Sequence, residues 1–296
     1  MCGRRMRVAF LALAGVLLTT AAPAAESQLR IIAFGAHPDD CDQRVGGTAA
    51  LWAAQGHRVK FVSVTNGDAG HQSEGGGALA RRRRAEAQEA GRRLGIAEYE
   101  TLDNHDGELV PSVAVREQII RKIRQWNADV VLGPRPNDYH PDHRYTGVLL
   151  QDAAYMVMVP NICPDTPALR KNPVFLYFQD HFQRPNPFRA DIAVVIDAVL
   201  ERKLAALDAH ASQMYEWLPF VEGILDRVPK DPAARLAWLR GQRTGQPLAA
   251  TVREALGKWY PAQAESVKEA EAFELCEYGG SAGPQELRRL FPFFDR

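Results

Sequence analysis

Two short clusters of histidine and carboxylate residues could carry out metal-assisted chemistry. One is His37-Pro38-Asp39-Asp40, and the other is His140-Pro141-Asp142-His143. Each cluster contains a proline, which restricts its own backbone and that of the preceding residue and so helps to aim the flanking side chains. Two histidines and one carboxylate are a common ligand set for catalytic zinc, with a fourth position left for water. A zinc ion held in this way lowers the pKa of its water to about 7 and polarises a carbonyl group.

A hydrolytic metal site also needs a base that does not bind the metal. Asp39 and Asp40 are consecutive, and adjacent side chains point in different directions, so one can bind the metal while the other faces the water. General-base assistance of this kind contributes about 10²–10⁴ in rate. A further histidine near the metal could stabilise the oxyanion or protonate the leaving amine. A single His-Pro or Asp-Asp pair in a loop is more often a turn with solvated charges. The prediction therefore depends on both clusters lying at strand ends of one sheet.

Hydrophobic periodicity predicts the elements that position these clusters. Strands are expected over residues 30–35, 59–65, 128–133, 175–178 and 192–196, and helices over 46–55, 79–94, 113–126, 145–158 and 197–212. Strands that alternate with helices predict an α/β fold, a Rossmann-like, mostly parallel sheet flanked by helices. Both clusters follow strands, and ligands of such sheets bind outside the carboxyl ends of the strands.

The sequence after about Trp217 is helical in pattern and interrupted by Pro229, Pro247 and Pro261. It contains no linker rich enough to mark a domain boundary, and no repeat or low-complexity segment. We therefore expect one domain over residues 25–296, with a core at about 30–213 and a helical C-terminal extension at about 214–296.

The N-terminus has the three parts of a secretory signal peptide, predicted over residues 1–24. Three arginines precede an apolar run from Val8 to Leu18, and Ala22-Pro23-Ala24 follows it. The run is shorter than the roughly 20 residues of a spanning helix, so a stable membrane anchor is not expected. Cleavage after Ala24, or close to it, would deliver the chain to the periplasm or the medium.

The charge balance argues against a nucleic-acid partner. Lysine plus arginine and aspartate plus glutamate each total 36, so the formal net charge is zero and there is no basic excess. The expected partner is a small molecule or a glycan, and the oligomeric state is left open. Three cysteines follow the signal sequence, so the mature chain can form at most one internal disulfide.

The two clusters resemble the motifs of the PIG-L/LmbE-like zinc deacetylases, which include N-acetylglucosaminyl-phosphatidylinositol de-N-acetylase. The likeness runs from about Ile31 to Gln213. It implies that His37, Asp40 and His143 bind one Zn²⁺ per chain, or another divalent ion, and that Asp39 is the general base. It further implies that His140 stabilises the tetrahedral intermediate or acts as an acid, and that Asp142 tunes His140.

The resemblance also implies substrate contacts. Arg83 matches an arginine that contacts substrate, and Asp106 matches a residue that binds sugar hydroxyls. Tyr139 is a third candidate for contact with the substrate; it precedes His140 directly, whereas an active-site tyrosine of some members lies one residue earlier. His210-Ala211-Ser212-Gln213 resembles a late signature of the family, and Glu271-Ala272-Phe273 resembles its closing motif.

These features predict an exported zinc-dependent hydrolase that removes an acetyl group from an N-acetylated sugar of the N-acetylglucosamine type. One alternative is a zinc amidase that acts on another acyl group or on a non-sugar amide. Another is an inactive sugar-binding relative, which the intact Asp39 argues against, because binding alone needs no free carboxylate beside the metal. The glycine-rich segment 67–77 is either a mobile loop over the pocket or a plain surface loop.

Overall fold

The structure is a computed structural model that describes residues 2–3 and 28–294. Apart from residues 2 and 3, the predicted signal peptide lies outside the described residues. Across the described part of the chain, no helix combines the length and the apolar character needed to cross a membrane.

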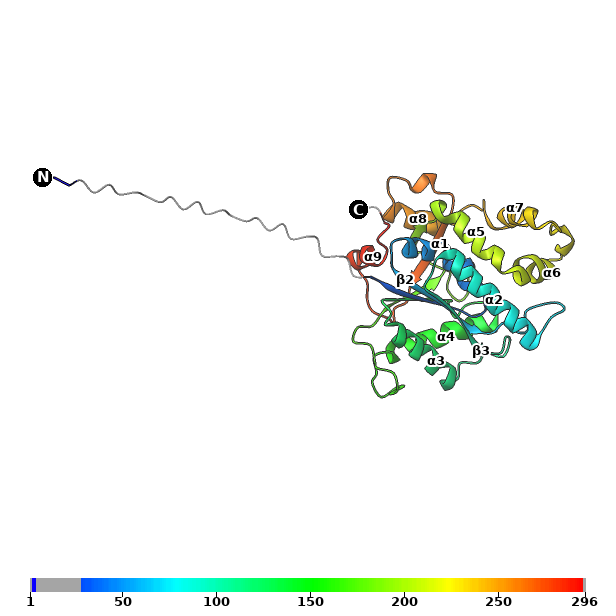
Figure 1. The fold of residues 1–296 in the computed structure, drawn as a ribbon, viewed down its shortest axis with the longest axis horizontal. Coiled ribbons are helices and arrows are strands. Elements are labelled where there is room, and N and C mark those ends of the chain that lie inside the picture. The colour runs from blue at the N-terminus through cyan, green and yellow to red at the C-terminus, as the bar shows by residue number, and fades with distance from the viewer. Residues whose placement is uncertain (1, 4–27, 295–296) are drawn as a thin grey trace.

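Seven strands and their flanking helices make up the described chain (Figure 1). The strands are β1 (Arg30–Gly35), β2 (Arg58–Thr65), β3 (Glu98–Asn104), β4 (Val130–Gly133), β5 (Val174–Phe178), β6 (Ile192–Val195) and β7 (Ala270–Leu275). The α-helices are α1 (Asp40–Ala54), α2 (Gly76–Leu94), α3 (Val113–Trp126), α4 (Pro141–Met156), α5 (Leu200–Ala209), α6 (Leu218–Val221), α7 (Pro232–Arg243), α8 (Ala250–Trp259) and α9 (Pro284–Leu290). A short π-helical segment, η2 (Gln213–Trp217), leads into α6.

The strands form one sheet in the order β3-β2-β1-β4-β5-β7-β6. Strands β1 to β5 pair in parallel, and β7 lies antiparallel between β5 and β6. This confirms the predicted α/β class and the mostly parallel sheet. The chain passes from β1 to β2 and β3 on one side and then returns to add β4 on the other side of β1. The order therefore reverses between β1 and β4, where a crevice for a ligand is expected.

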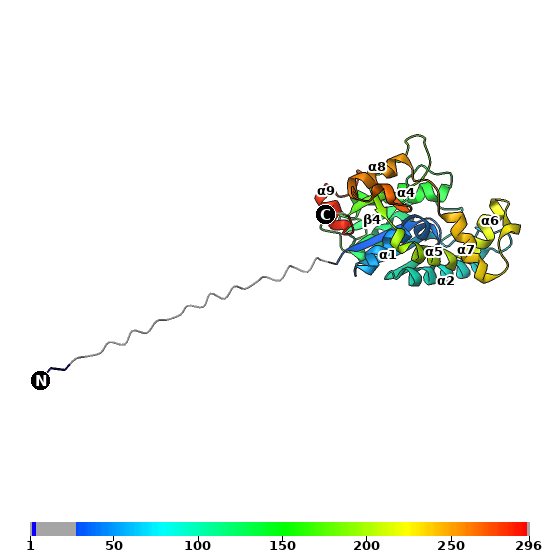
Figure 2. The same ribbon diagram turned by 90° about the horizontal axis from the view of Figure 1, so that it is seen from above.

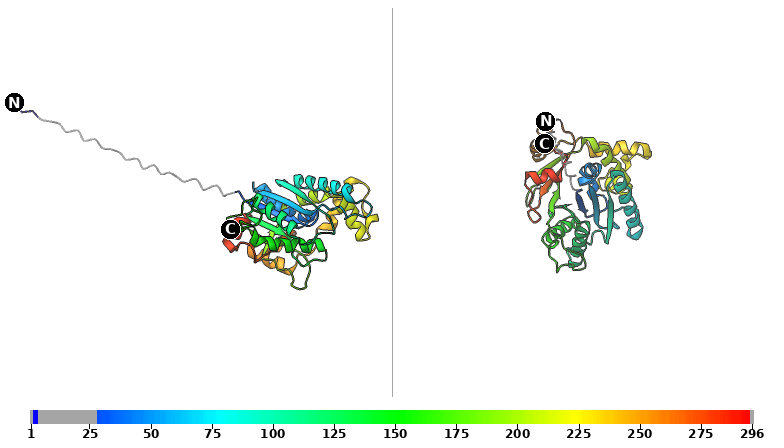
Figure 3. Two further views of the ribbon diagram at one scale, coloured as in Figure 1. Left: turned by 90° about the horizontal axis from the view of Figure 1, so that it is seen from below. Right: turned by 60° about the vertical axis from the view of Figure 1, so that its left-hand side comes forward.

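Helices cover both faces of the sheet, because alternate side chains of each buried strand point to opposite faces. On β1, Ile31 and Ala33 belong to a core shared with α1, α2 and α8, whereas Ile32 and Phe34 belong to a second core shared with α3 and α4. The two helical layers are visible in Figure 1 and in the right-hand view of Figure 3. Viewed from above, α6 and α7 lie at the end of the molecule opposite α9 (Figure 2).

Helices α1 and α4 begin earlier in the chain than the periodicity predicts. Helix α1 starts at Asp40 and α4 starts at Pro141, so the first residue of each helix belongs to one of the two clusters. Proline is favoured in the first turn of a helix because its missing N–H would have no partner there. The His140 side chain accepts a hydrogen bond from the Asp142 N–H and caps α4.

Two strands lie where the sequence pattern predicts none. Strand β3 (EYETLDN) is an edge strand with mostly partly exposed side chains, so it lacks the apolar run that marks a buried strand. Strand β7 lies within the segment predicted to be a helical extension, and the structure corrects that prediction for residues 270–275. The predicted closing motif Glu271-Ala272-Phe273 is therefore part of the sheet.

Buried polar side chains join the late signature to the rest of the fold. His210 Nε2 lies 3.0 Å from Asp42 Oδ2, and both residues are fully buried. Ser212 donates both its N–H and its hydroxyl to Glu86 on α2. The Gln213 amide donates to the Gly70 carbonyl at 3.0 Å. This signature therefore fixes the chain after α5 against α1, α2 and the loop after β2.

Glu271 on β7 plays a similar part at the middle of α1. Its carboxylate is buried and accepts hydrogen bonds from the Gly47 and Thr48 N–H groups, from the Thr48 hydroxyl and from Lys203. The helix that begins with Asp40 is thus held by a strand of the C-terminal segment.

Replacing Glu271 with glutamine should lower the free energy of unfolding by about 2–4 kcal/mol, because the new amide group would face buried donors. Urea unfolding of Glu271→Gln and of the parent measures the difference. Glu277→Ala, at an exposed position close by, serves as the control and should change stability by less than about 0.5 kcal/mol. Equal effects of the two substitutions would contradict the anchoring role of Glu271.

Candidate metal centre and active site

The two clusters meet at the point where the order of the sheet reverses. His37 follows β1, and His143 follows β4, which pairs directly with β1. His37 and His143 are 106 positions apart in the sequence, yet His37 Nδ1 and His143 Nε2 lie 3.2 Å apart. Parallel pairing of the two strands accounts for this contact, because it brings their carboxyl ends to the same edge.

Three donor atoms converge here in the arrangement that a tetrahedral metal site requires. Asp40 Oδ2 lies 3.7 Å from His37 Nδ1 and 3.5 Å from His143 Nε2. Metal bonds of 2.0–2.1 Å in a tetrahedron imply ligand atoms about 3.3 Å apart, so the spacing fits a divalent cation. The structure thus brings together the three predicted ligands, His37, Asp40 and His143.

Each ligand histidine is held by a carboxylate on its other ring nitrogen. His37 Nε2 lies 3.0 Å from Asp106 Oδ1 and 3.2 Å from Asp142 Oδ2. His143 Nδ1 lies 3.1 Å from Asp138 Oδ1. Such partners fix the tautomer and the orientation of a metal-binding imidazole. They leave His37 Nδ1 and His143 Nε2 facing the proposed metal position.

The charges of this group also suit a cation. Burial alone would lower the pKa of His37, but hydrogen bonds to Asp106 and Asp142 outweigh it and raise the pKa to about 10. Burial opposes ionisation of Asp40, yet His143 and His37 hold its pKa at about 2. His37 Nδ1 and His143 Nε2 face each other, and a divalent cation would compete with protons for these two nitrogens.

His37 takes part in two further groups of possible ligands. Ring nitrogens of His37, His140 and His143 lie within 4.8 Å of one another, and so do donor atoms of His37, Asp106, His140 and Asp142. In the second group the carboxylates share the Nε2 side of His37 and leave its Nδ1 side unused. The arrangement of His37, Asp40 and His143 is compatible with a metal site, and their role as the ligands stays a prediction.

Asp39 stands beside the metal position and is held by two other side chains. Its Oδ1 accepts from Arg83 at 3.0 Å, and its Oδ2 accepts from Gln43 at 2.8 Å. The residue has φ 142° and ψ −23°, a conformation that costs about 1–3 kcal/mol for a residue with a side chain. Because of this backbone conformation, the side chains of Asp39 and Asp40 point in different directions. The prediction of one residue as base and the other as metal ligand requires this.

The environment of Asp39 also favours a base. Burial raises the pKa of Asp39 above its ordinary value, although Arg83 opposes this, and the neighbouring Asp40 adds to the rise. A carboxylate with a raised pKa accepts a proton more readily.

His140 presents a hydrogen-bond donor to the same site. Its Nδ1 accepts the Asp142 N–H at 3.2 Å, which assigns the ring proton of the neutral form to Nε2. Burial lowers the pKa of His140, and the charges of His37 and His143 lower it further. A neutral imidazole with an Nε2–H suits stabilisation of an oxyanion better than donation of a full proton. The Asp142 carboxylate contacts His37. Asp142 therefore affects His140 through its backbone N–H, which donates to His140 Nδ1, and through the negative charge of its carboxylate.

Arg83 and Asp106 lie beneath the site, where they are almost fully buried. Arg83 is 2% exposed and donates to Asp39, to the Pro38 carbonyl and to the Gly67 carbonyl. Asp106 lies between Arg83 Nη1, at 3.5 Å, and His37 Nε2. In this arrangement both residues position catalytic groups, and the predicted contacts with a sugar stay predictions.

The glycine-rich loop after β2 packs directly on Arg83. A Cβ atom at Gly67 or Gly70 would lie 2.6 Å or 2.8 Å from Arg83 Nη1. The loop is tied to η2 through Gln213 and through His71, whose Nε2 lies 2.8 Å from Glu216 Oε2. The loop therefore packs on Arg83 and η2, and the two predicted possibilities, a mobile loop over the pocket or a plain surface loop, both stay predictions.

Tyr139 lies at the rim and is 74% exposed. Its ring centroid lies 5.8 Å from that of His140 and 5.9 Å from that of His143. It is therefore accessible to a substrate, as its predicted role requires.

Two residues of this site were not identified from the sequence. Asp138 orients His143, and Gln43 holds the second oxygen of Asp39. The signals were present, because Asp138 adjoins the second cluster and Gln43 lies one helical turn after Asp39. Neither residue type is informative, however, until the partner is known.

Comparison with known proteins agrees with this geometry. Residues 32–154 match the family model PIG-L, described as GlcNAc-PI de-N-acetylase. The chain is 31% identical over 210 residues to diacetylchitobiose deacetylase of Thermococcus kodakarensis, covering 66% of this chain and 76% of that protein. The chain belongs to the PIG-L family. The predicted resemblance is thus confirmed, and with it the enzyme class, a metal-dependent N-deacetylase.

Other relatives extend the comparison. The solved structure of N,N'-diacetylchitobiose deacetylase from Pyrococcus horikoshii superposes with a TM-score of 0.64 at 26% identity, over 84% of each chain. A 4-oxalmesaconate hydratase of Pseudomonas putida is 28% identical over 215 residues, which cover 68% of this chain and 80% of that protein. The PIG-L fold thus carries more than one reaction.

Substitution of Asp138 with asparagine should weaken metal binding about 10–100-fold, because His143 would lose the carboxylate that orients it. Titration of the metal-free protein with zinc, with a competing chelator, measures the affinity. Asp165→Asn, which alters an exposed aspartate paired with Arg121, is the matched control and should bind as the parent does. Unchanged affinity in Asp138→Asn would show that Asp138 does not support the metal site.

Proposed function

We propose that this protein is an exported, zinc-dependent hydrolase that removes the acetyl group from an N-acetylated sugar of the N-acetylglucosamine type. The observation that carries the proposal is Asp39, a buried carboxylate that adjoins the ligand Asp40 and is not itself needed to bind the metal. A protein that only bound sugars would have no use for such a base in a strained conformation.

A zinc ion held by His37, Asp40 and His143 would polarise the amide carbonyl and lower the pKa of a water molecule. Asp39 takes a proton from the attacking water as the C–O bond forms. The Nε2–H of His140 donates to the carbonyl oxygen as negative charge develops there. The amide C–N bond then breaks, and the proton held by Asp39 passes to the leaving amine. The products are acetate and an amino sugar.

The choice of substrate class is supported by the relatives. Two of them are deacetylases of diacetylchitobiose, and they cover most of this chain. The exposed ring of Tyr139 beside His140 and His143 offers a surface against which a sugar could lie. An amidase for another acyl group or a non-sugar amine remains the alternative, and the same assay separates them.

Replacement of Asp39 by asparagine should lower kcat for acetate release about 10²–10⁴-fold, because the base is lost. Zinc content should stay near that of the parent, because Asp39 is not a ligand. Acetate release from diacetylchitobiose and N-acetylglucosamine, measured beside metal analysis, tests both expectations.

His143→Ala is the matched comparison, since it should lose metal and activity together. A fully active Asp39→Asn enzyme would show that the assigned mechanism is wrong. Acetate release from non-sugar acetamides alone would favour the alternative substrate class.

The export part of the proposal is supported by the three-part N-terminal pattern alone. Expression of the full chain in a bacterial host should yield a mature protein that begins at or near Ala25 in the periplasm or the medium. N-terminal sequencing of each fraction measures this. An intact N-terminus on protein confined to the cytoplasm would contradict export.

A further inference from the structure

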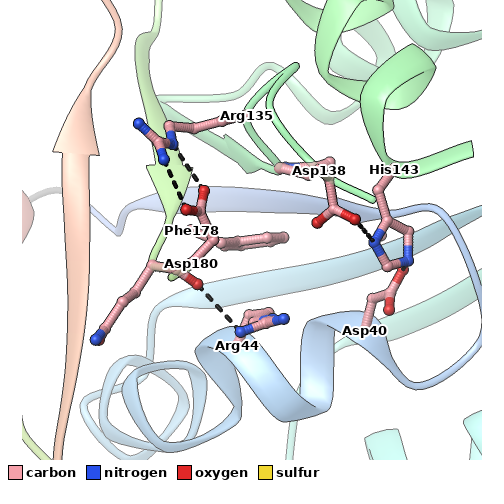
Figure 4. A pocket seen from close by; sticks show the side chains of 10 residues that line it. Asp40, Arg44, Arg135, Asp138, His143, Phe178 and Asp180 are labelled. Atoms are coloured by element: carbon pink, nitrogen blue, oxygen red, sulfur yellow. Dashed lines mark hydrogen bonds and ion pairs between the residues drawn. The ribbon is translucent and has the colours of Figure 1, made fainter. Parts of the chain in front are cut away.

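The loop that follows β5 borders the metal position. A pocket lies between this loop and the predicted ligands (Figure 4). Asp40 and His143 line one part of the pocket, and Gln179 and Asp180 of the loop line another. The loop continues into aromatic side chains that the metal site and the proposed reaction leave unused.

Arg135 fixes the loop after β5. Its guanidinium forms a two-point ion pair with the Asp180 carboxylate, at 2.7 Å and 2.6 Å, which Figure 4 shows. It also donates to the carbonyl oxygens of Phe182 and Asn186, at 3.2 Å and 3.0 Å. The Asp180 carboxylate in turn accepts the Phe182 N–H at 3.0 Å. Arg135 is 4% exposed, so breaking this buried network would be costly, and the backbone of Phe182 is held on both sides.

Three rings follow one another from the metal site onto this loop, and we call Tyr139, Phe182 and His181 the aromatic wall. The centroid of the Tyr139 ring lies 5.9 Å from that of His143 and 6.3 Å from that of Phe182. The centroid of the His181 ring lies 4.4 Å from that of Phe182. Across residues 28–294, the ring contacts of Phe182 are with Tyr139 and His181 alone. The wall therefore leads away from the metal position, with Tyr139 first and Phe182 second.

The wall presents apolar surface to solvent. Tyr139 is 74% exposed, His181 is exposed, and Phe182 is half-buried. A single exposed aromatic ring is ordinary on a protein surface, but three rings in contact beside a metal site form a continuous surface for a ligand. One face of a pyranose ring carries C–H groups that pack on an aromatic ring, while the hydroxyl groups at its edge stay in water.

We infer that the aromatic wall forms two sugar subsites, in which Tyr139 binds the sugar attached to the reactive one and Phe182, packed on His181, binds the next. The preferred substrate is then an N-acetylated oligosaccharide of at least three sugars. This inference rests on the proposed deacetylase function and narrows its substrate class. It goes beyond the disaccharide that is named for two of the relatives.

The position of the wall favours a sugar chain as its occupant. The Tyr139 ring contacts those of His140 and His143, so a sugar whose acetamide reaches the metal has its attached group beside Tyr139. Within residues 28–294, Tyr139 and His181 form hydrogen bonds through their backbone carbonyls only. The Tyr139 hydroxyl and the His181 ring nitrogens are thus available to sugar hydroxyls, whereas an acyl chain would leave them without partners.

The test measures acetate release by the zinc-loaded mature enzyme from N-acetylglucosamine, diacetylchitobiose and the corresponding trimer and tetramer. Binding energy from sugars remote from the reacting bond raises kcat/KM. After correction for the number of acetyl groups, kcat/KM should rise about 3–10-fold at each step from one sugar to three. It should change little from three sugars to four, because the wall has no further ring.

Substitutions assign each step to one ring. Tyr139→Ala should remove the gain from one sugar to two, and Phe182→Ala should remove the gain from two to three while leaving the first gain in place. Phe182→Tyr keeps an aromatic ring and should keep both gains. Tyr155→Ala is the matched control, since this tyrosine of α4 is also 74% exposed and lies outside the wall, and it should leave the series unchanged.

The outcomes separate the two proposals. Equal kcat/KM for the dimer and the trimer, or a Phe182→Ala series equal to that of the parent, would overturn the two subsites and leave the proposed function standing. Calorimetric binding of the same sugars to zinc-loaded Asp39→Asn enzyme gives a readout without turnover. Binding that strengthens with length and is weakened by Phe182→Ala, with no acetate released by the parent, would support the subsites and contradict the deacetylase proposal.

Discussion

The parallel pairing of β1 with β4 is the constraint on which the rest of this structure depends. It places His37 and Asp40 at the end of one strand beside His143 at the start of the helix that follows the other. Three donor atoms 3.2–3.7 Å apart are unfavourable neighbours unless a proton or a cation lies among them. The fold therefore has to hold these atoms in place, and many of the buried polar side chains around the site do so.

Buried charges around the site are arranged so that each has a partner. Asp39 pairs with Arg83, and Asp42 pairs with His210. His37 pairs with Asp106 and Asp142. An unpaired charge at any of these positions would cost several kcal/mol, so each residue restricts its neighbours. The same pairing explains why the glycine-rich loop lies flat on Arg83, because larger residues at Gly67 or Gly70 would collide with the guanidinium.

The PIG-L fold does not by itself decide which reaction occurs. A hydratase from Pseudomonas putida shares the fold with a TM-score of 0.60 at 21% identity. Reaction and substrate must then depend on the side chains around the metal and on segments added to the common core. In this chain the segment after α5 returns strand β7 to the sheet.

The sequence determined the chemistry and the general frame of the protein. Residue types and spacing in the two clusters predicted a hydrolytic metal site, and the resemblance to the PIG-L family implied His37, Asp40 and His143 as its ligands and Asp39 as its base. Apolar periodicity specified the central strands and helices, since buried strands and amphipathic helices have distinct patterns. The edge strand β3 and the returning strand β7 carry no such pattern, because one is partly exposed and the other depends on pairing with distant strands. Only the tertiary structure decided that Asp138 orients His143 and that Arg83 lies buried against Asp39. Contacts of this kind join residues far apart in sequence, and their energy arises only when the chain has folded.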